Sequence, residues 1–109
     1  MTTVTFFRKN GRIVRFEASE HTGYSEEGTD IVCSAVSALT ITTVNGLQEY
    51  LKIPVGVEFT DGYIYCTLQD DISDEDWAKA EILLETLVLG LNSIVQEYGN
   101  NLNTIEREV

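Results

Sequence analysis

The segment VGVEFTDGYIYCTL, residues 55–68, is typical of a β-hairpin and is the starting point for predicting the fold class. Asp61-Gly62 is a strong signal for a two-residue turn between strands whose apolar and polar residues alternate. A hairpin closed at this turn pairs Val55 with Leu68, Val57 with Cys66, and Phe59 with Ile64. These six side chains form one apolar face, and the other face carries Glu58, Tyr65 and Thr67, as in a half-solvated antiparallel sheet.

Helical patterns lie on both sides of this hairpin. From Ile31 to about Leu51, apolar or small residues surround the helical projection and charge is absent until near the end, which predicts a largely buried helix. The many β-branched residues would also suit a strand, but the length and the stop at Lys52-Ile53-Pro54 favour a helix. After the hairpin, Ser73–Asp76 supplies caps and first-turn negative charge. Apolar residues then recur at helical spacing from Trp77 to Tyr98, with Gly99 as a C-terminal cap.

The beginning of the chain predicts another hairpin, because segments rich in Val, Ile, Thr and Phe flank Asn10-Gly11. A two-residue loop there pairs Phe7 with Val14 and Thr5 with Phe16 on one face, and Phe6 with Arg15 and Val4 with Glu17 on the other. The first face is the better core candidate. Residues 104–109 predict a short final strand. The sequence therefore predicts a single α+β domain over residues 1–109, of β-β-α-β-β-α-β order, with two hairpins packed with two helices.

Composition restricts the classes of partner. The chain has 109 residues, of which 43% are hydrophobic, enough for one core without disulfide or metal staples. Its formal net charge of −11 disfavours nucleic acid and anionic membrane surfaces and permits a basic partner. The start does not resemble a secretory signal, and no run approaches the ~18 apolar residues of a membrane span. We therefore expect a cytoplasmic protein without nucleic-acid or membrane partners.

The two cysteines have different sequence contexts. Cys66 alternates onto the apolar face of the hairpin, where burial raises a thiol pKa, so we predict a structural core residue. Cys33 follows Asp30 by three residues. If Asp30 is the helix N-cap, Cys33 lies in the first turn, where unpaired N–H groups and the helix dipole favour a thiolate. The alternative is that Cys33 is one more small apolar residue of a buried helix.

Other candidates are His21 and Ser37. His21, the single histidine, lies in the polar segment from Ser19 to Thr29, and a loop that folds back could bring its imidazole to the Cys33 sulfur. The alternative is a solvated histidine. Ser37 follows Cys33 by one helical turn and could line the same pocket, or its hydroxyl could bond to the i−4 carbonyl.

Metal and nucleotide chemistry have little support. A zinc site would have only His21, Cys33 and Cys66 as strong ligands, and Cys66 is already assigned to the core. No glycine-rich phosphate loop is present. We therefore expect no metal and no cofactor.

The segment HTGYSEEGTDIVCSAVSALTITTVNGL, from His21 to Leu47, resembles the signature of the ribosomal-processing cysteine proteases, the Prp family of bacteria. The similarity combines the histidine with a following Gly-Tyr, the string DIVCSAVSAL from Asp30 to Leu39, and TVNGL from Thr43 to Leu47. It extends over nearly the whole chain. Glu20 and Ser34 stand where glycine and alanine are usual in the family, and neither replaces the cysteine.

This resemblance implies a cysteine endopeptidase. Its substrate would be the precursor of a large-subunit ribosomal protein, which would lose its N-terminal extension by cleavage after an aromatic residue in a Phe-Phe-containing stretch. By position, Cys33 would be the nucleophile and His21 the general base of a Cys-His dyad, with Asp30 and Ser37 in supporting roles. Family members are similar in being cytoplasmic homodimers. The competing hypothesis is a noncatalytic acidic adaptor that binds a basic ribosomal protein, with Cys33 merely packed in a helix.

Overall fold

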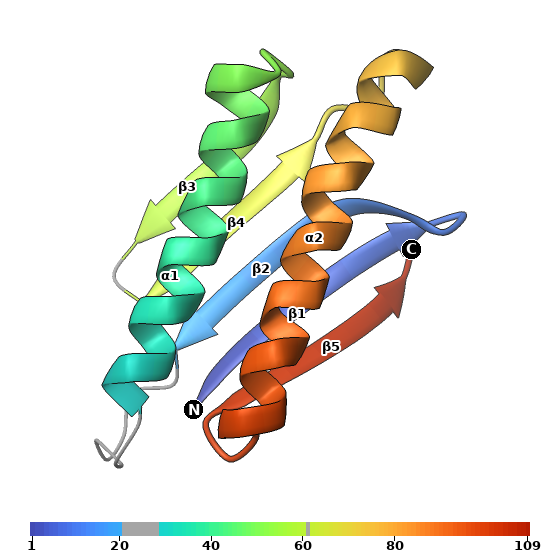
Figure 1. Cartoon of the computed structure of the whole chain (residues 1–109). Helices are drawn as coiled ribbons and strands as arrows, with labels where there is room; N and C mark the ends of the chain where they lie inside the picture. Colours follow the sequence, from blue (N-terminus) through green and yellow to red (C-terminus); the bar gives the residue numbers. More distant parts are fainter. Residues whose placement is uncertain (21–28, 61) are drawn as a thin grey trace.

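Two helices cover one face of a five-stranded sheet in the computed structural model (Figure 1). The structure describes the backbone of residues 1–20, 29–60 and 62–109, and the side chains of 1–19, 31–60 and 62–109. The elements in chain order are β1 (Thr2–Lys9), β2 (Arg12–Glu20), α1 (Thr29–Asn45), the π-helical turn η1 (Gly46–Tyr50), β3 (Val55–Thr60), β4 (Tyr63–Leu68), α2 (Asp74–Tyr98) and β5 (Leu102–Glu108). The α+β class and the β-β-α-β-β-α-β order are therefore confirmed.

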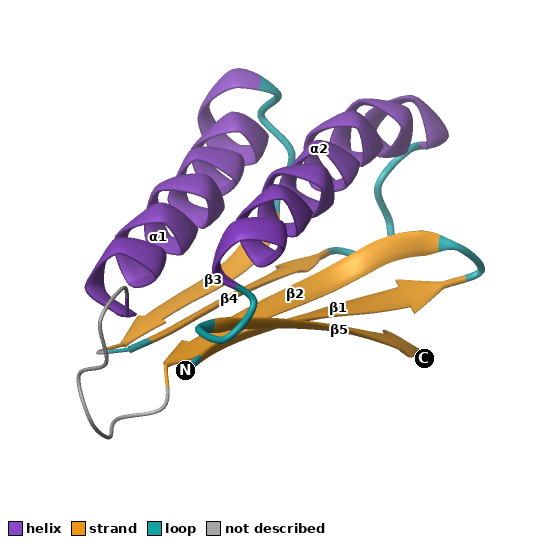
Figure 2. Cartoon of the chain, turned by 60° about the horizontal axis from the view of Figure 1, so that its bottom comes forward, coloured by secondary structure: helices purple, strands orange, loops and turns teal. Residues whose placement is uncertain are grey.

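The sheet has the strand order β3-β4-β2-β1-β5, which sequence patterns did not predict. All neighbouring strands are antiparallel except β1 and β5, which run parallel because α2 carries the chain back across the sheet before β5. Both helices lie on the same face of the sheet (Figure 2). The core is the layer between the helices and this face.

The hairpin of β3 and β4 has the predicted register. Val55 pairs with Leu68, Val57 with Cys66, and Phe59 with Ile64. On β4 the predicted apolar face is buried, at Ile64, Cys66 and Leu68. On β3 it is only partly covered, and Phe59 remains 56% exposed, because β3 is the edge strand of the sheet.

All four pairs predicted for the hairpin of β1 and β2 are wrong, because Phe7 pairs with Arg15, Phe6 with Phe16, Thr5 with Glu17 and Val4 with Ala18. Asn10 and Gly11 form the expected turn, both with positive φ (52° and 83°). A register shift between Phe7 and Arg8 then changes the pairing, so that Phe6 lies opposite Phe16. Beyond such a β-bulge, every following residue faces the side of the sheet opposite to the one that the uninterrupted register predicts. The predicted core residue Phe16 is buried, but its core partners on β1 are Val4 and Phe6, whereas the predicted Thr5 and Phe7 are half-buried.

Helix α1 confirms the choice of helix over strand for the segment after Ile31. The expectation that it is largely buried is wrong. Val32, Val36 and Val44 pack into the core, but Ile31 and Ile41 are 60% and 42% exposed, since the helix covers the sheet with one face and leaves the other open. By length and composition alone, Ile31–Tyr50 could cross a membrane, but a core helix passes the same test, and the inner face of this one packs on the sheet.

Helix α2 has the predicted start and end. The Ser73 hydroxyl accepts a hydrogen bond from the Asp76 N–H at 3.1 Å, and Gly99 is the C-cap. Apolar residues at helical spacing make the buried stripe: Trp77, Ala80, Leu84, Leu87 and Leu91. The last strand begins at Leu102, two residues earlier than predicted, because Leu102 is itself a core residue.

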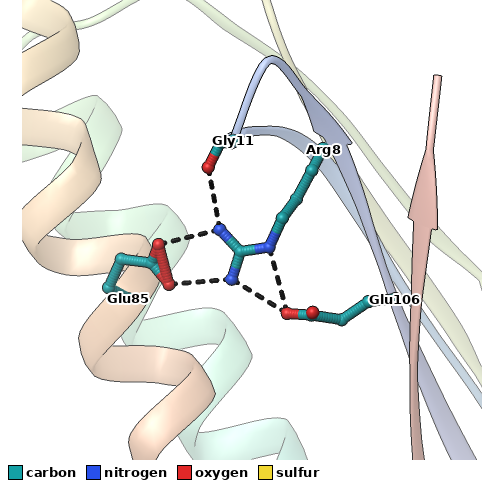
Figure 3. Close-up of polar contacts among 4 residues, drawn as sticks. All are labelled: Arg8, Gly11, Glu85 and Glu106. Atoms are coloured by element: carbon teal, nitrogen blue, oxygen red, sulfur yellow. Dashed lines mark hydrogen bonds and ion pairs between the residues drawn. The ribbon is translucent and has the colours of Figure 1, made fainter.

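Arg8 joins the hairpin of β1 and β2 to α2 and β5 (Figure 3). Its Nη1 and Nη2 each donate to one carboxylate oxygen of Glu85 at 2.9 Å, and its Nε donates to Glu106 Oε1 at 3.0 Å. Nη1 also donates to the Gly11 carbonyl at 3.0 Å. The hydrogen bonds from Arg8 lower the pKa of Glu85. One cation of the first hairpin therefore holds two elements whose carboxylates lie 77 and 98 residues later in the sequence.

We expect the Arg8→Met variant to have a free energy of unfolding about 1 kcal/mol lower than the wild type at pH 7. This value is the contribution of a bidentate ion pair, reduced because Glu85 is partly exposed to solvent. The pKa of Glu85 is lower in the folded state, so this stabilisation is present above its ordinary pKa of 4.5 and is lost as the pH falls through the lowered value. Urea denaturation at pH 7 and at the lowest pH where both proteins fold would measure it. A difference between wild type and variant that does not shrink in acid would contradict this role for the pair.

Candidate active site

A pocket of about 220 Å³ lies between α1 and the sheet. Helix α1 contributes Cys33 and Ser37, and the far wall comes from the end of β2 and from the β3–β4 hairpin. The remaining lining residues are Thr2, Ala18, Ser19, Val36, Thr40, Ile41, Phe59, Thr60, Gly62, Tyr63 and Ile64. The pocket is therefore open to solvent at one side of α1 and closed on the other by core residues.

Cys33 is a half-buried thiol that reaches this pocket. It is the fifth residue of α1, because the helix begins at Thr29. The condition that Asp30 is the N-cap is therefore not met, since Asp30 lies within the helix. Side chains of a helix are tilted toward its N-terminus, so position 33 still directs its side chain toward the first turn, where N–H groups have no partner within the helix. The alternative, in which Cys33 is a packed residue of a buried helix, does not fit, because Cys33 is only half-buried and lines the pocket.

Ser37 lies one turn after Cys33 on the pocket side of α1. The i−4 hydrogen bond considered for Ser37 is made in this helix by threonines instead, from Thr40 to the Val36 carbonyl and from Thr43 to the Leu39 carbonyl, both at 2.8 Å. The Ser37 side chain is exposed. Its hydroxyl is thus placed to contact a molecule in the pocket.

Cys66 is the structural thiol that the sequence predicts. It is fully buried on β4, in contact with the core, and this burial raises its pKa to about 12. At neutral pH almost none of this thiol is ionised, so it is a poor nucleophile and a poor metal ligand.

His21 lies outside the described residues, and so does the side chain of Asp30. The structure therefore does not test the proposed Cys-His dyad. Ser19, two residues before His21 in the sequence, lines the pocket. Within the described ranges, no group of three or more His, Cys, Asp or Glu side chains is placed to hold a metal ion.

Sequence patterns missed the apolar side of the pocket. Phe59 and Ile41 both line it and both keep a large exposed area, yet one was assigned to a hairpin core and the other to a buried helix. The alternation of β3 does place Phe59 on the helix-facing side. Its exposure depends on β3 being an edge strand, and that follows from strand order, which local patterns do not determine.

Comparisons with known proteins give the family of this chain. The model of the family described as cysteine protease Prp matches residues 1–103. The chain belongs to the Prp family. It is therefore a cysteine protease, and the resemblance noted from His21 to Leu47 is confirmed over almost the whole sequence.

Curated Prp relatives are similar along most of their length. The ribosomal processing cysteine protease Prp of Bacillus subtilis is 28% identical over 92 residues, which cover 83% of this chain and 82% of the relative. The protein of the same name from Staphylococcus aureus is 27% identical over 94 residues, covering 84% and 85%.

Solved structures share the fold. The crystal structure of SMU.848 from Streptococcus mutans has a TM-score of 0.85 at 28% identity, covering 100% of this chain and 99% of its own. The S. aureus Prp structure with a substrate peptide has a TM-score of 0.86 at 23% identity, covering 98% and 100%. The same enzyme with a covalently linked product peptide has a TM-score of 0.81 at 25% identity, covering 98% and 100%.

Proposed function

We propose that this member of the Prp family is an endopeptidase that removes the N-terminal extension of a large-subunit ribosomal protein precursor, cutting after an aromatic residue. The observation that carries the proposal is the position of Cys33, a thiol on the open side of a pocket large enough for a side chain, in a chain of this family. The curated relatives are named for ribosomal processing. The net charge of −11 is complementary to a basic precursor.

The proposed reaction uses Cys33 as nucleophile and His21 as base. The imidazole of His21 takes the thiol proton, and the Cys33 sulfur attacks the carbonyl carbon of the scissile bond. Backbone N–H groups in the first turn of α1 stabilise the resulting oxyanion. The C–N bond breaks as His21 protonates the departing amine, which leaves a thioester. Water then attacks the thioester with His21 again as base, so the acid product and the thiol are released.

The proposal also gives roles to Ser37 and Asp30 and extends to the assembly of the protein. Ser37 contacts the substrate from the next turn of α1, and Asp30 has a supporting role at the start of the same helix. From the family resemblance we also expect a homodimer in the cytoplasm. The second candidate function is a noncatalytic adaptor, and the accessible position of Cys33 in the pocket argues against it.

The test is incubation of the protein with a synthetic basic peptide that carries a Phe-Phe stretch, followed by mass spectrometry. We expect cleavage after the aromatic pair by the untreated protein and none after alkylation with iodoacetamide, because alkylated Cys33 has no nucleophilic sulfur. The treated sample also controls for a contaminating protease of another class. Binding of the peptide without cleavage by either sample would favour the adaptor and overturn the endopeptidase.

A further inference from the structure

The outer edge of β3 lies beside the pocket. In the strand order, β3 is at one end of the sheet, and β4 is its partner among the residues that the structure describes (Figure 1). The last residues of this strand, Phe59 and Thr60, line the pocket together with Cys33. Within the part of the chain that the structure describes, the outer edge of β3 therefore has no partner strand and leads to the pocket that Cys33 lines.

The register shows which backbone groups face outward. Thr60 and Tyr63 pair with two residues between them in the sequence. In a hairpin with so short a connection the flanking residues form a hydrogen-bonded pair, and hydrogen-bonded and non-bonded pairs then alternate along the antiparallel ladder. Glu58 therefore bonds to β4. Val57 and Phe59 belong to the non-bonded pairs, so their N–H and C=O groups point away from β4.

Exposed apolar side chains flank this edge where it meets the pocket. Phe59 is 56% exposed, and across the pocket Ile41 of α1 is 42% exposed. The opposite edge strand, β5, ends in Glu106, Arg107 and Glu108, the kind of charged edge that prevents added strands from pairing. The edge of β3 has one charged residue, Glu58.

We propose that the outer edge of β3 binds the peptide substrate as an added strand, with alternate side chains of the peptide entering the pocket between Phe59 and Ile41. In this mode, main-chain hydrogen bonds provide affinity and alternate side chains provide specificity. The inference rests on the proposed function, which it extends from the nucleophile to the binding of the substrate. A strand added next to β3 would lie about 4.8 Å from it.

The first test uses single N-methylation along the substrate peptide. Methylation removes one N–H donor at a time, so we expect kcat/KM to fall about tenfold or more at alternate residues and to change less than twofold at the residues between them. A fall in kcat/KM that does not alternate from residue to residue would overturn the added strand. Because the protein is unchanged, folding of a variant does not enter this test.

The second test is the Val57→Pro variant, which removes an outward N–H without removing a hydrogen bond to β4. We expect KM to rise about tenfold while kcat changes little. The rate of Cys33 alkylation by iodoacetamide should stay at the wild-type value, which shows that the pocket is intact. An unchanged KM in a variant with intact alkylation would overturn the proposal.

Thr104→Pro is the matched control on the other edge. The Asn101 carbonyl and the Val109 N–H both bond to β1, so the odd-numbered residues of β5 face β1 and the N–H of Thr104 faces outward. This variant should keep the wild-type KM.

A binding measurement separates the two proposals. A fluorescent peptide is titrated into Cys33→Ala with and without Val57→Pro. Weaker binding in the double variant, with no cleavage by wild type, would support the added strand and overturn the endopeptidase. Suppose instead that the wild type cleaves the peptide, both variants bind it equally, and the effect of N-methylation does not alternate along the peptide. This result would support the endopeptidase and overturn the added strand.

Discussion

Replacing Cys33 by alanine should lower kcat/KM for the Phe-Phe peptide at least about a thousandfold, to the background of the assay, because no other described side chain in the pocket is a thiol. Cys33 is only half-buried, so the loss of its sulfur should move the thermal midpoint by no more than a degree or two. Activity is measured by mass spectrometry and folding by circular dichroism on the same samples.

Cys66→Ala is the control for this substitution. It removes the same atom from a fully buried position, so it should cost about 1–2 kcal/mol of stability by leaving a small cavity, while the folded molecules cleave at the wild-type rate. Cleavage that persists in Cys33→Ala, or is lost in a folded Cys66→Ala, would assign the nucleophile to another group.

The two thiols should also differ at least about a thousandfold in their rate of alkylation. Cys66 is inaccessible and its pKa is raised to about 12, so it should react only in unfolded molecules. Cys33 faces the pocket at the start of a helix, and a neighbouring imidazolium would favour its thiolate. A short pulse of iodoacetamide at several pH values, followed by peptide mapping, measures both rates in one sample.

His21→Ala tests the dyad in the same experiment. We expect it to slow the alkylation of Cys33 about tenfold near neutral pH and to leave Cys66 unchanged, because only the first thiol would lose a counter-ion. Two thiols that react equally slowly in the wild type would instead fit the adaptor.

The two hairpins show what local sequence can and cannot determine. For β3 and β4 the turn residues and the alternation agree, so counting outward from Asp61-Gly62 predicts each pair correctly. The same counting from Asn10-Gly11 fails after Arg8, because the register shifts between Phe7 and Arg8 and places Phe6 opposite Phe16, with their ring centroids 6.2 Å apart. A bulge of this kind has no strong signal within its own strand.

The candidate site was predictable where it depends on one helix. The spacing of four residues places Cys33 and Ser37 on one side of α1, and both line the pocket. The opposite wall depends on which strand is at the edge, and this is decided by tertiary packing. Phe59 therefore looked like a core residue from its alternation alone.

The parallel pairing of β1 with β5 has a consequence for synthesis of the protein on the ribosome. Thr2 lines the pocket, and its N–H bonds to the Asn101 carbonyl at 2.9 Å, so the first strand is held in place by a segment almost one hundred residues later. Ribosomes release the chain from its N-terminus, and contacts of such long range form last. We therefore expect a nascent chain to carry Cys33 for most of its translation without a finished pocket, and the pocket to be completed only after residues 102–108 have emerged.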